Sequence, residues 1–335
     1  MIVLGVETSC DETAVAVVEN GFTVRSNLIA SQVDLHRRFG GVVPEVAARA
    51  HVESLTPLLD QALLEAGVGF GDIDAVAVTI GPGLVGALLV GMAAAKAVVL
   101  ATGAGFVGVN HLEGHIWANF LEHGSPAPPY VCLVVSGGHT MLVHMPELHR
   151  YEVLGQTLDD AAGEAFDKVA RLLGLGFPGG PALDELSKKG DPTAIRFPRA
   201  MQDSGDFDFS MSGLKTAVLR HVKGERAAGR DIDTADLAAS FQEALVDVQV
   251  KKTLQAAEKV GVGTVLLGGG VVANTRLRDR MTSEGAAAGV RVLYPSLELC
   301  TDNAAMIACA GAARFLRGER SSLDIGADPN LRLTP

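Results

Sequence analysis

The sequence predicts an α/β protein of two similarly built lobes that face a central cleft. One observation is a repeated pattern in which two short runs of β-type residues flank a polar turn, first around T-S-C-D-E-T and again around S-G-G-H. The other is that helical sequence, and then a hydrophobic strand ending in glycine, follows each pair of strands. A pattern that occurs twice in this order indicates two copies of one architecture.

The expected elements follow the same order in each copy. The strands are residues 2–5, 13–18 and 75–80 in the first copy and 130–135, 140–144 and 264–267 in the second. The helices are residues 43–66, 84–102, 111–122, 158–173, 234–260, 274–288 and 301–316. Because the last helix follows the second glycine turn, we expect it to return to the first lobe and make that lobe discontinuous. The expected lobes are residues 1–107 plus 303–335 and residues 108–302, the second carrying most of the candidate site.

The bulk composition suits a well-folded globular protein and limits what it binds. Hydrophobic residues make up 48% of the 335 residues and the mean hydropathy is +0.26, which is enough for two lobes with their own cores. The net charge of −11 provides no global positive field for nucleic acid. Any contact with a polyanion therefore needs local basic patches or a partner.

Cysteine usage and the termini point to the cytoplasm. The four cysteines form no C-x-x-C pair and no disulfide-like framework, which suits a reducing compartment. The N-terminus enters an apolar strand at Ile2 without a basic region or cleavage site, so a secretory signal is not expected. Residues 84–101 are strongly apolar, but they are rich in Gly and Ala and include Lys96. A buried helix fits them better than a membrane span, and we expect no membrane association.

A candidate metal site combines His111 and His115 of H-L-E-G-H with Asp302 of L-C-T-D-N. Two imidazoles at positions i and i+4 project from one helix face, and a carboxylate completes a three-ligand site that leaves a coordination position open for substrate. The two histidines alone suit a solvated or capped helix face equally well. The glycine-rich turns elsewhere in the chain favour the metal site.

Two glycine-rich turns are candidate anion sites. In S-G-G-H-T, Gly137 and Gly138 let backbone N–H groups approach an anion and Ser136 adds a hydroxyl, although a tight hairpin turn explains the same letters. G-G-G-V-V-A-N at 268–274 lies between a strand and a helix, where a nucleotide binds in many folds. Asn274 is then the N-cap of the helix, a ligand contact or both.

Acidic residues follow the second hairpin. Asp160, Glu164 and Asp167 share one helical face, which is usually solvent-facing. F-P-G-G-P follows with Asp184 behind it, and carboxylates behind a glycine turn suit ribose hydroxyls. The segment F-D-F-S-M-S-G-L-K at 207–215 is either a substrate-facing loop or a strand edge.

A set of motifs spread in order over nearly the whole chain resembles the bacterial tRNA N6-adenosine threonylcarbamoyltransferase family, once described as O-sialoglycoprotein endopeptidases. The motifs are T-S-C-D-E-T, F-G-G-V-V-P-E, G-P-G-L-V-G-A-L-L-V-G, N-H-L-E-G-H, L-V-V-S-G-G-H-T, D-D-A-A-G-E-A-F-D-K-V-A, F-P-G-G-P, F-S-M-S-G-L-K-T, G-G-G-V-V-A-N and C-T-D-N-A-A-M-I-A. The resemblance implies an actin, Hsp70 and hexokinase-like fold of two ribonuclease H-like lobes. This agrees with the duplicated pattern.

The resemblance also implies a reaction and its residues. The threonylcarbamoyl group of threonylcarbamoyl-adenylate would pass to N6 of the adenosine next to the anticodon, in tRNAs that read codons starting with A. By position, the family's metal ligands, for iron or zinc, correspond to His111, His115 and Asp302. Its adenylate-binding positions correspond to Val134, Val135, Ser136, Gly137, Gly138, Asp167, Gly180, Asp184 and Asn274. Asp11 and Glu12 match a polar pair that we take as candidate catalytic residues, and ATP is a further nucleotide candidate.

The implied partners are tRNA, a smaller paralogous subunit, a P-loop ATPase subunit and a separate threonylcarbamoyl-adenylate synthase. Candidate tRNA patches are Arg37 with Arg38, residues 220–230, and Arg276, Arg278 and Arg280. Each such cluster is more often a solvated face than a binding site. The exposed parts of helices 43–66 and 84–102 are the expected paralogue interface.

Three other functions compete with the transferase. A metalloprotease of the zincin type needs H-E-x-x-H, but here Glu113 lies two residues after His111, about 200° around the helix and away from the metal face. An ATP-binding regulatory or chaperone-like module, or a sugar kinase, could share the fold. Such proteins bind magnesium through phosphates and carboxylates and have no need of H-x-x-x-H.

Overall fold

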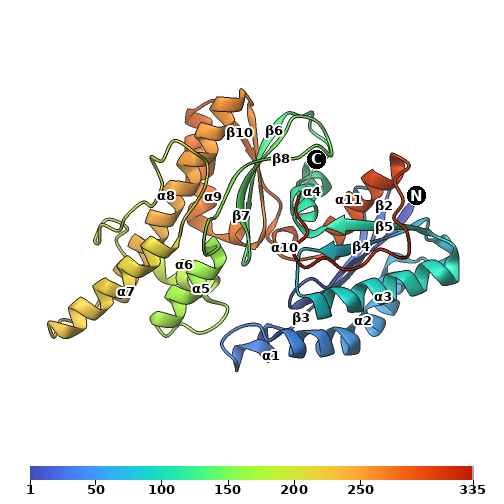
Figure 1. The fold of residues 1–335 in the computed structure, drawn as a ribbon, viewed down its shortest axis with the longest axis horizontal. Helices are drawn as coiled ribbons and strands as arrows, with labels where there is room; N and C mark the ends of the chain where they lie inside the picture. The colour runs from blue at the N-terminus through green and yellow to red at the C-terminus, as the bar shows by residue number, and fades with distance from the viewer. Residues whose placement is uncertain (334–335) are drawn as a thin grey trace. The chain divides into compact units, whose positions relative to one another are not determined.

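The computed structural model describes residues 1–333, and residues 334 and 335 of the predicted first lobe lie outside this range. The chain forms two compact units (Figure 1). Unit 1 comprises Met1–Pro126 and Pro295–Leu333, and unit 2 comprises Ala127–Tyr294. The C-terminal helix therefore returns to the first unit, as the order of the elements predicted.

The sheet of unit 1 has five strands in the order β3-β2-β1-β4-β5. These are β1 (Ile2–Glu7), β2 (Glu12–Glu19), β3 (Thr23–Ser31), β4 (Ala75–Gly81) and β5 (Gly105–Asn110). The pairs β1–β2 and β2–β3 are antiparallel, whereas β1–β4 and β4–β5 are parallel. The helices are α1 (Val33–Arg37), α2 (Pro44–Ala66), η1 (Phe70–Asp72), α3 (Val85–Thr102), α4 (His111–His123), α10 (Leu297–Cys300) and α11 (Ala304–Leu316).

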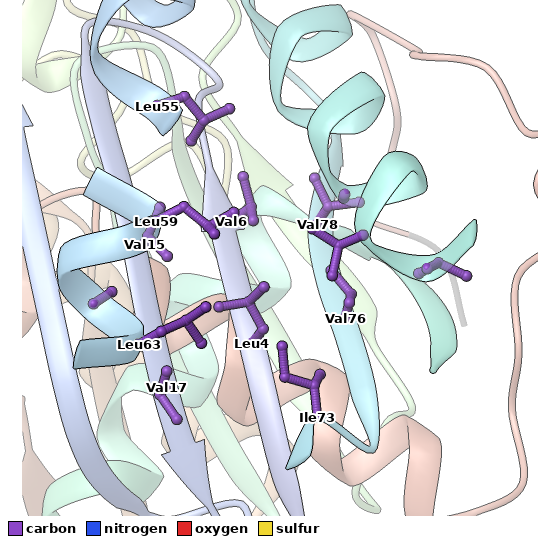
Figure 2. Packing of buried hydrophobic residues seen from close by; sticks show 14 of the residues in the cluster. Leu4, Val6, Val15, Val17, Leu55, Leu59, Leu63, Ile73, Val76 and Val78 are labelled. Atoms are coloured by element: carbon purple, nitrogen blue, oxygen red, sulfur yellow. The ribbon is translucent and has the colours of Figure 1, made fainter. Parts of the chain in front are cut away.

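Helices cover both faces of this sheet. Leu4 and Val6 of β1 join the apolar core under α2 and α3, where Leu59 of α2 also lies (Figure 2). The alternate residue Gly5 points to the opposite face, where a Cβ would lie 2.3 Å from the carbonyl oxygen of Ala304 on α11. Because both faces are buried, β1 reads as a continuous apolar run.

Unit 2 repeats this arrangement in the strand order β10-β9-β6-β7-β8. Its strands are β6 (Tyr130–Val135), β7 (Thr140–Met145), β8 (Glu152–Gln156), β9 (Thr264–Gly268) and β10 (Arg291–Leu293). Its helices are α5 (Ala162–Leu172), α6 (Gly179–Ser187), α7 (Ser212–Ala227), α8 (Thr234–Val260), η2 (Gly270–Ala273) and α9 (Thr275–Ala287). The hairpin β6–β7 and the parallel pair β6–β9 match β1–β2 and β1–β4. The predicted α/β class and its duplication are confirmed.

The units differ from the predicted lobes at both boundaries. We expected a division at 107/108 and 302/303, but helix α4 and the segment around α10 belong to unit 1. Helix α4 packs along α11, which lies against the unit 1 sheet. The pairing of two helices far apart in sequence therefore moves the boundary to 126/127 and 294/295.

Helix α3 is long and apolar enough to cross a membrane by length and composition. In the structure one side of it packs on β4 and α2, with Leu88, Met92 and Ala95 buried. A core helix of a globular unit passes the same test. The packed side of α3 agrees with the buried helix that the sequence predicted, whereas Val85, Leu89 and Leu100 on the same helix are exposed.

Candidate active site

Helix α4 presents His111 and His115 on one face. The helix begins where the Asn110 side chain accepts a hydrogen bond from the Leu112 N–H at 2.8 Å, a regular N-cap. The two imidazole rings are buried, with centroids 4.6 Å apart at an interplanar angle of 78°. The i and i+4 spacing therefore gives the ring pair that the sequence predicted.

Asp302 reaches the two rings because α4 and α11 approach closely. A Cβ at Gly114, between the histidines, would lie 2.7 Å from the Ile307 side chain of α11. Asp302 immediately precedes Asn303, the N-cap of this helix, and its Oδ1 lies 3.5 Å from Nε2 of His111 and 3.2 Å from Nε2 of His115. The glycine of H-L-E-G-H thus allows the helix contact that brings the three ligands together.

A buried carboxylate, which sequence reasoning missed, orients His111. Glu7, at the end of β1, accepts hydrogen bonds from the Thr79 hydroxyl at 2.6 Å and from Nδ1 of His111 at 3.0 Å. The Ser9 hydroxyl lies 3.1 Å from the same ring nitrogen. With its Nδ1 proton directed to Glu7, the ring turns Nε2 towards Asp302. The available signal was a single acid closing the apolar run I-V-L-G-V-E.

The charges around the rings favour one cation. Burial lowers the pKa of His111, but the negative charges of Asp302 and Glu7 outweigh it and raise this pKa to about 9. Burial raises the pKa of Glu7, and its ion pair with His111 more than offsets this, so the pKa is lowered. Burial lowers the pKa of His115, which keeps that ring neutral. Two carboxylates thus stabilise one positive charge between the imidazoles.

The ring of His115 provides a test of whether a metal fits. It is fully buried, and neither ring nitrogen has a hydrogen-bond partner among residues 1–333, because the 3.2 Å contact with Asp302 is poorly aligned. Buried polar atoms are rarely left without a partner. One nitrogen or oxygen atom from each of His111, His115 and Asp302 lies within 4.8 Å of the others. Ligands about 2.1 Å from a tetrahedral ion lie about 3.4 Å apart, so the donor set fits a transition metal.

Glu113 does not join this cluster. Its Oε2 lies 3.4 Å from the Arg314 guanidinium of α11. The carboxylate is therefore directed away from the histidines, as its position on the helix predicted. A zincin needs its glutamate beside the metal as general base, so this geometry does not suit a protease.

Asp11 and Glu12 lie at the turn between β1 and β2 in the same unit. Both are partly buried, and the Ser31 hydroxyl donates to Oε1 of Glu12 at 3.3 Å. Burial, followed by the negative charges of Asp302 and Asp11, raises the pKa of Glu12 to about 9. These acids therefore contribute to the electrostatics around Asp302, as catalytic groups commonly do.

The S-G-G-H turn of unit 2 exposes two glycines that the fold does not require. Val134, Val135 and Ser136 are buried at the end of β6, whereas Gly137 and Gly138 are exposed. A Cβ at either glycine would meet no atom within 4 Å, and neither has a left-handed φ. The free space over the backbone therefore suits the close approach of a ligand.

Asp167 and Gly180 lie at the start of α6. Oδ1 of Asp167 accepts a hydrogen bond from the Gly179 N–H at 2.7 Å. Gly180 belongs to the first helical turn, and a Cβ there would meet no atom within 4 Å. The Asp167 carboxylate is therefore held against the first turn of α6.

Asp184 and Asn274 are in direct contact. The Asn274 side chain caps α9 by accepting from the Leu277 N–H, and its amide donates to Asp184 at 3.1 Å and to Gln242 at 2.7 Å. Asp184 also accepts from the Thr275 hydroxyl at 2.7 Å. The N-cap role of Asn274 is confirmed, and the side chain also holds Asp184 in place.

The segment 207–215 combines a strand edge, one of the two structures that the sequence predicted, with the start of a helix. Phe209 forms an isolated bridge with Thr157, next to the end of β8. Helix α7 begins at Ser212, and Asp159 accepts hydrogen bonds from the N–H groups of Met211 and Ser212. Lys215, within the first turns of the helix, forms an ion pair with Asp160. The serines of F-S-M-S-G thus begin a helix whose first donors are satisfied by a distant carboxylate.

Comparisons with known proteins identify the family of the chain. The family model for tRNA N6-adenosine threonylcarbamoyltransferase (TsaD) matches residues 23–309. The chain belongs to this family. It is 53% identical over 331 residues to the enzyme of that name from Clostridium botulinum, covering 99% of this chain and 97% of the relative. It is 51% identical over 332 residues to that of Clostridium perfringens, covering 99% and 98%.

Solved structures of the same fold are more distant in sequence. HypF of T. kodakarensis superposes with a TM-score of 0.63 at 14% identity over 95% of this chain, which spans 47% of the HypF chain. The activator of 2-hydroxyisocaproyl-CoA dehydratase from Clostridium difficile superposes with a TM-score of 0.54 at 14% identity, covering 96% of this chain and 99% of the activator. These similarities establish the actin and Hsp70-like fold alone.

Family membership decides the class of reaction. The chain is a transferase that modifies tRNA by threonylcarbamoyl transfer to N6 of adenosine. No finding supports the regulatory or protease alternatives. The His-His-Asp cluster is compatible with a bound metal in this transferase.

Proposed function

We propose that the chain transfers the threonylcarbamoyl group from threonylcarbamoyl-adenylate to the adenosine next to the anticodon, in tRNAs that read codons starting with A. The observation that carries the proposal is the buried cluster of His111, His115 and Asp302, oriented by Glu7, in a member of this family. A mixed anhydride with an adenylate leaving group is already activated. The protein needs to position the two substrates and stabilise charge, and it needs no nucleophile of its own.

A divalent iron or zinc ion, held by His111, His115 and Asp302, would supply a Lewis acid to a phosphate or carbonyl oxygen of the donor. The chain's own contribution is to orient these ligands. Glu7 fixes the Nδ1 tautomer of His111 and leaves its Nε2 free to ligate. Elemental analysis of the purified protein distinguishes iron from zinc.

We assign adenylate binding to the residues around the glycine turn of unit 2. The exposed backbone of Gly137 and Gly138 suits the phosphate, since a Cβ there would meet no protein atom. Asp167 and Asp184 lie beside the start of α6 and the N-cap of α9, where carboxylates suit ribose hydroxyls. Asn274 then acts mainly by holding Asp184. The same arrangement would admit ATP.

Acyl transfer also needs a proton acceptor for the attacking amine. As the C–N bond forms, the anhydride C–O bond breaks, adenylate leaves, and the N6 amine loses one proton. Glu12 and Asp11 are the candidate groups that orient the amine and accept this proton. Burial and the negative charges of Asp302 and Asp11 raise the pKa of Glu12 to about 9, so its carboxyl is mostly protonated at neutral pH and suits orienting the amine. Asp11 is then the candidate acceptor of the proton.

We propose that the enzyme works in the cytoplasm with tRNA, a smaller paralogous subunit, a P-loop ATPase subunit and a separate synthase. Exposed apolar side chains on α2 and α3, including Val52, Val85 and Leu89, support these helices as the paralogue surface. Among the basic clusters, Arg276 and Arg280 form ion pairs with Glu243, which reduces the positive charge available to bind RNA phosphates.

The experiment combines the purified chain, its partner subunits, threonylcarbamoyl-adenylate and unmodified tRNA, with the product identified by mass spectrometry. His115→Ala should lose both metal and product, because it removes a buried ligand. His123→Ala, on the exposed end of the same helix, is the matched control and should keep both. Product formation by metal-free His115→Ala protein would refute the metal role. Absence of product from metal-loaded wild-type protein would refute the proposed reaction.

A further inference from the structure

Unit 1 contains a second group of buried polar side chains that neither metal binding nor the proposed chemistry uses. His51 lies on α2, His36 on α1, and Gln32 immediately before α1. Their exposed fractions are 0%, 0% and 6%. Burying two imidazoles and an amide costs free energy unless every polar atom has a partner, so their hydrogen bonds define what they do.

These side chains form one continuous hydrogen-bond chain. The Val43 N–H donates to Nδ1 of His36 at 3.3 Å, and Nε2 of His36 lies 3.1 Å from Oε1 of Gln32. Nε2 of Gln32 lies 3.3 Å from Nδ1 of His51, and Nε2 of His51 lies 3.0 Å from the Cys10 carbonyl oxygen. The chain therefore runs from one backbone group to another through three side chains.

The two ends fix its direction. A backbone N–H only donates and a carbonyl only accepts, so every hydrogen bond between Val43 and Cys10 must point the same way. Both histidines must then be neutral with the proton on Nε2. The amide orientation of Gln32 is fixed independently, because its Nε2 also donates to the Ala47 carbonyl at 3.3 Å. Burial, the largest cause, lowers the pKa of His51, which agrees with a neutral ring.

At the Cys10 end the chain holds the turn that carries Asp11 and Glu12. His51 donates to the Cys10 carbonyl, and the backbone N–H of Gln32 donates to the next carbonyl, that of Asp11, at 3.0 Å. The Thr13 hydroxyl lies 2.8 Å from Nδ1 of His51. The backbone on either side of Asp11, up to the peptide bond with Glu12, is therefore fixed by His51 and its partner Gln32.

At its other end the hydrogen-bond chain reaches an exposed segment of the backbone. His36 accepts at its backbone carbonyl from the Phe39 N–H at 2.9 Å and, through Nδ1, from the Val43 N–H. Phe39 is 54% exposed, and Arg37 and Arg38 precede it. The conformation of residues 37–43 is thus linked to the turn of Asp11 and Glu12 by directed hydrogen bonds.

We propose that His51 is a positioning residue for the transfer reaction, holding the Asp11 and Glu12 turn through the Cys10 carbonyl and linking it to residues 37–43 by way of Gln32 and His36. The proposal rests on the proposed function, since it assigns His51 to the same catalytic turn. Apolar side chains would fill this space at a lower desolvation cost. They could not fix the orientation of two consecutive carbonyls beside the candidate catalytic acids.

The test compares His51→Leu, His51→Gln and Leu59→Ala in the full complex with partners and substrates. Leu59 is buried on the same helix and takes no part in the chain, so Leu59→Ala controls for lost stability. His51→Leu should lower kcat on the order of 100-fold with unchanged metal content, because the turn is released. His51→Gln, which keeps an N–H for the Cys10 carbonyl, should recover most of the rate. Should His51→Leu fail to fold, Gln32→Met breaks the same chain while keeping its backbone N–H.

If His51→Leu kept a kcat as high as that of Leu59→Ala, the proposal would be overturned. Loss of metal by His51→Leu would overturn it as well. A second readout does not depend on turnover. Nitrogen-15 chemical shifts of the imidazoles in the wild-type protein should show both His51 and His36 as neutral Nε2–H tautomers at neutral pH. An Nδ1–H tautomer or a charged ring at His51 would refute the directed chain of hydrogen bonds. If the wild type forms no product but shows these tautomers, the proposed reaction has failed and the role of His51 in it falls with it, while the hydrogen-bond chain stands.

Discussion

The two units have one strand topology but very different residues at the equivalent hairpin turns. In unit 1 the turn between β1 and β2 is surrounded by acids, including the buried Glu7 and the partly buried Glu12, beside His111. In unit 2 the turn between β6 and β7 presents Gly137 and Gly138, which are exposed and uncharged. The duplicated fold thus sets where a turn lies, and the residues on it determine whether it suits a cation or an anion.

The glycine turns after β4 and β9, in contrast, have the same structural role in both units. A Cβ at Gly83 would lie 2.5 Å from the Ser9 carbonyl oxygen, and one at Gly269 would lie 2.4 Å from that of Val135. Each glycine therefore lets the turn pack against the first hairpin. Glycines required by packing can be separated in this way from glycines left open for a ligand.

The largest effect should come from removing the charge that orients His111. Glu7→Gln should lower metal affinity about 10- to 100-fold, as loss of a partner that orients a ligand commonly does. Nucleotide binding should be unchanged, because the adenylate positions lie in unit 2. Metal titration of the apoprotein measures the first quantity, and calorimetry with ATP or AMP measures the second.

Glu113→Gln is the matched control for Glu7→Gln, since Glu113 is on the same helix as the ligands but contacts Arg314. It should leave metal affinity unchanged. Equal losses in the two variants would mean that the effect is one of general charge, and that the contact between Glu7 and His111 has no special role.

A smaller and more selective effect should distinguish the two kinds of glycine in unit 2. Gly269→Ala should destabilise the protein by about 1–3 kcal/mol, because its φ is +98° and the new methyl group meets Val135. Gly137→Ala should leave the melting temperature unchanged and weaken adenylate binding. Thermal unfolding and calorimetry with AMP measure the two quantities.

A fall in melting temperature in Gly137→Ala equal to that of Gly269→Ala would contradict the distinction. Unchanged AMP affinity in Gly137→Ala would instead remove the S-G-G-H turn from the proposed adenylate site.

The sequence was most informative where the signal is local. The two hairpins, the glycine turns and the i and i+4 histidines were all predicted, because each depends on residues close together in the chain. The edge strand β3 was missed because its residues alternate little and are largely exposed or half-buried. The helix α7 was missed because its cap, Asp159, lies far from it in sequence.

Long-range contacts account for the remaining differences. The sequence predicts helix α4 in the second lobe, and only its packing on α11 assigns it to the first unit. Glu7, Gln32 and His51 carry no motif, and each gains its role from a partner on another element. A composition or spacing rule cannot find such residues, because their chemistry depends on the fold being formed.

The smallest effect should come from the cap of α7, which tests whether stability in unit 2 can be changed without touching either candidate site. Asp159→Ala should cost about 0.5–2 kcal/mol of stability, as loss of an N-terminal cap does. Hydrogen bonds from Ser210 and Ser212 outweigh the effect of burial and lower the pKa of Asp159. A lowered pKa means that this stabilisation is complete above the pKa of the unfolded chain and is lost as pH falls through the folded value. The difference in unfolding free energy between wild type and Asp159→Ala should therefore shrink in acid, with metal content unchanged at neutral pH. A difference that persists in strong acid would mean that Asp159 acts through packing and that its charge is unimportant.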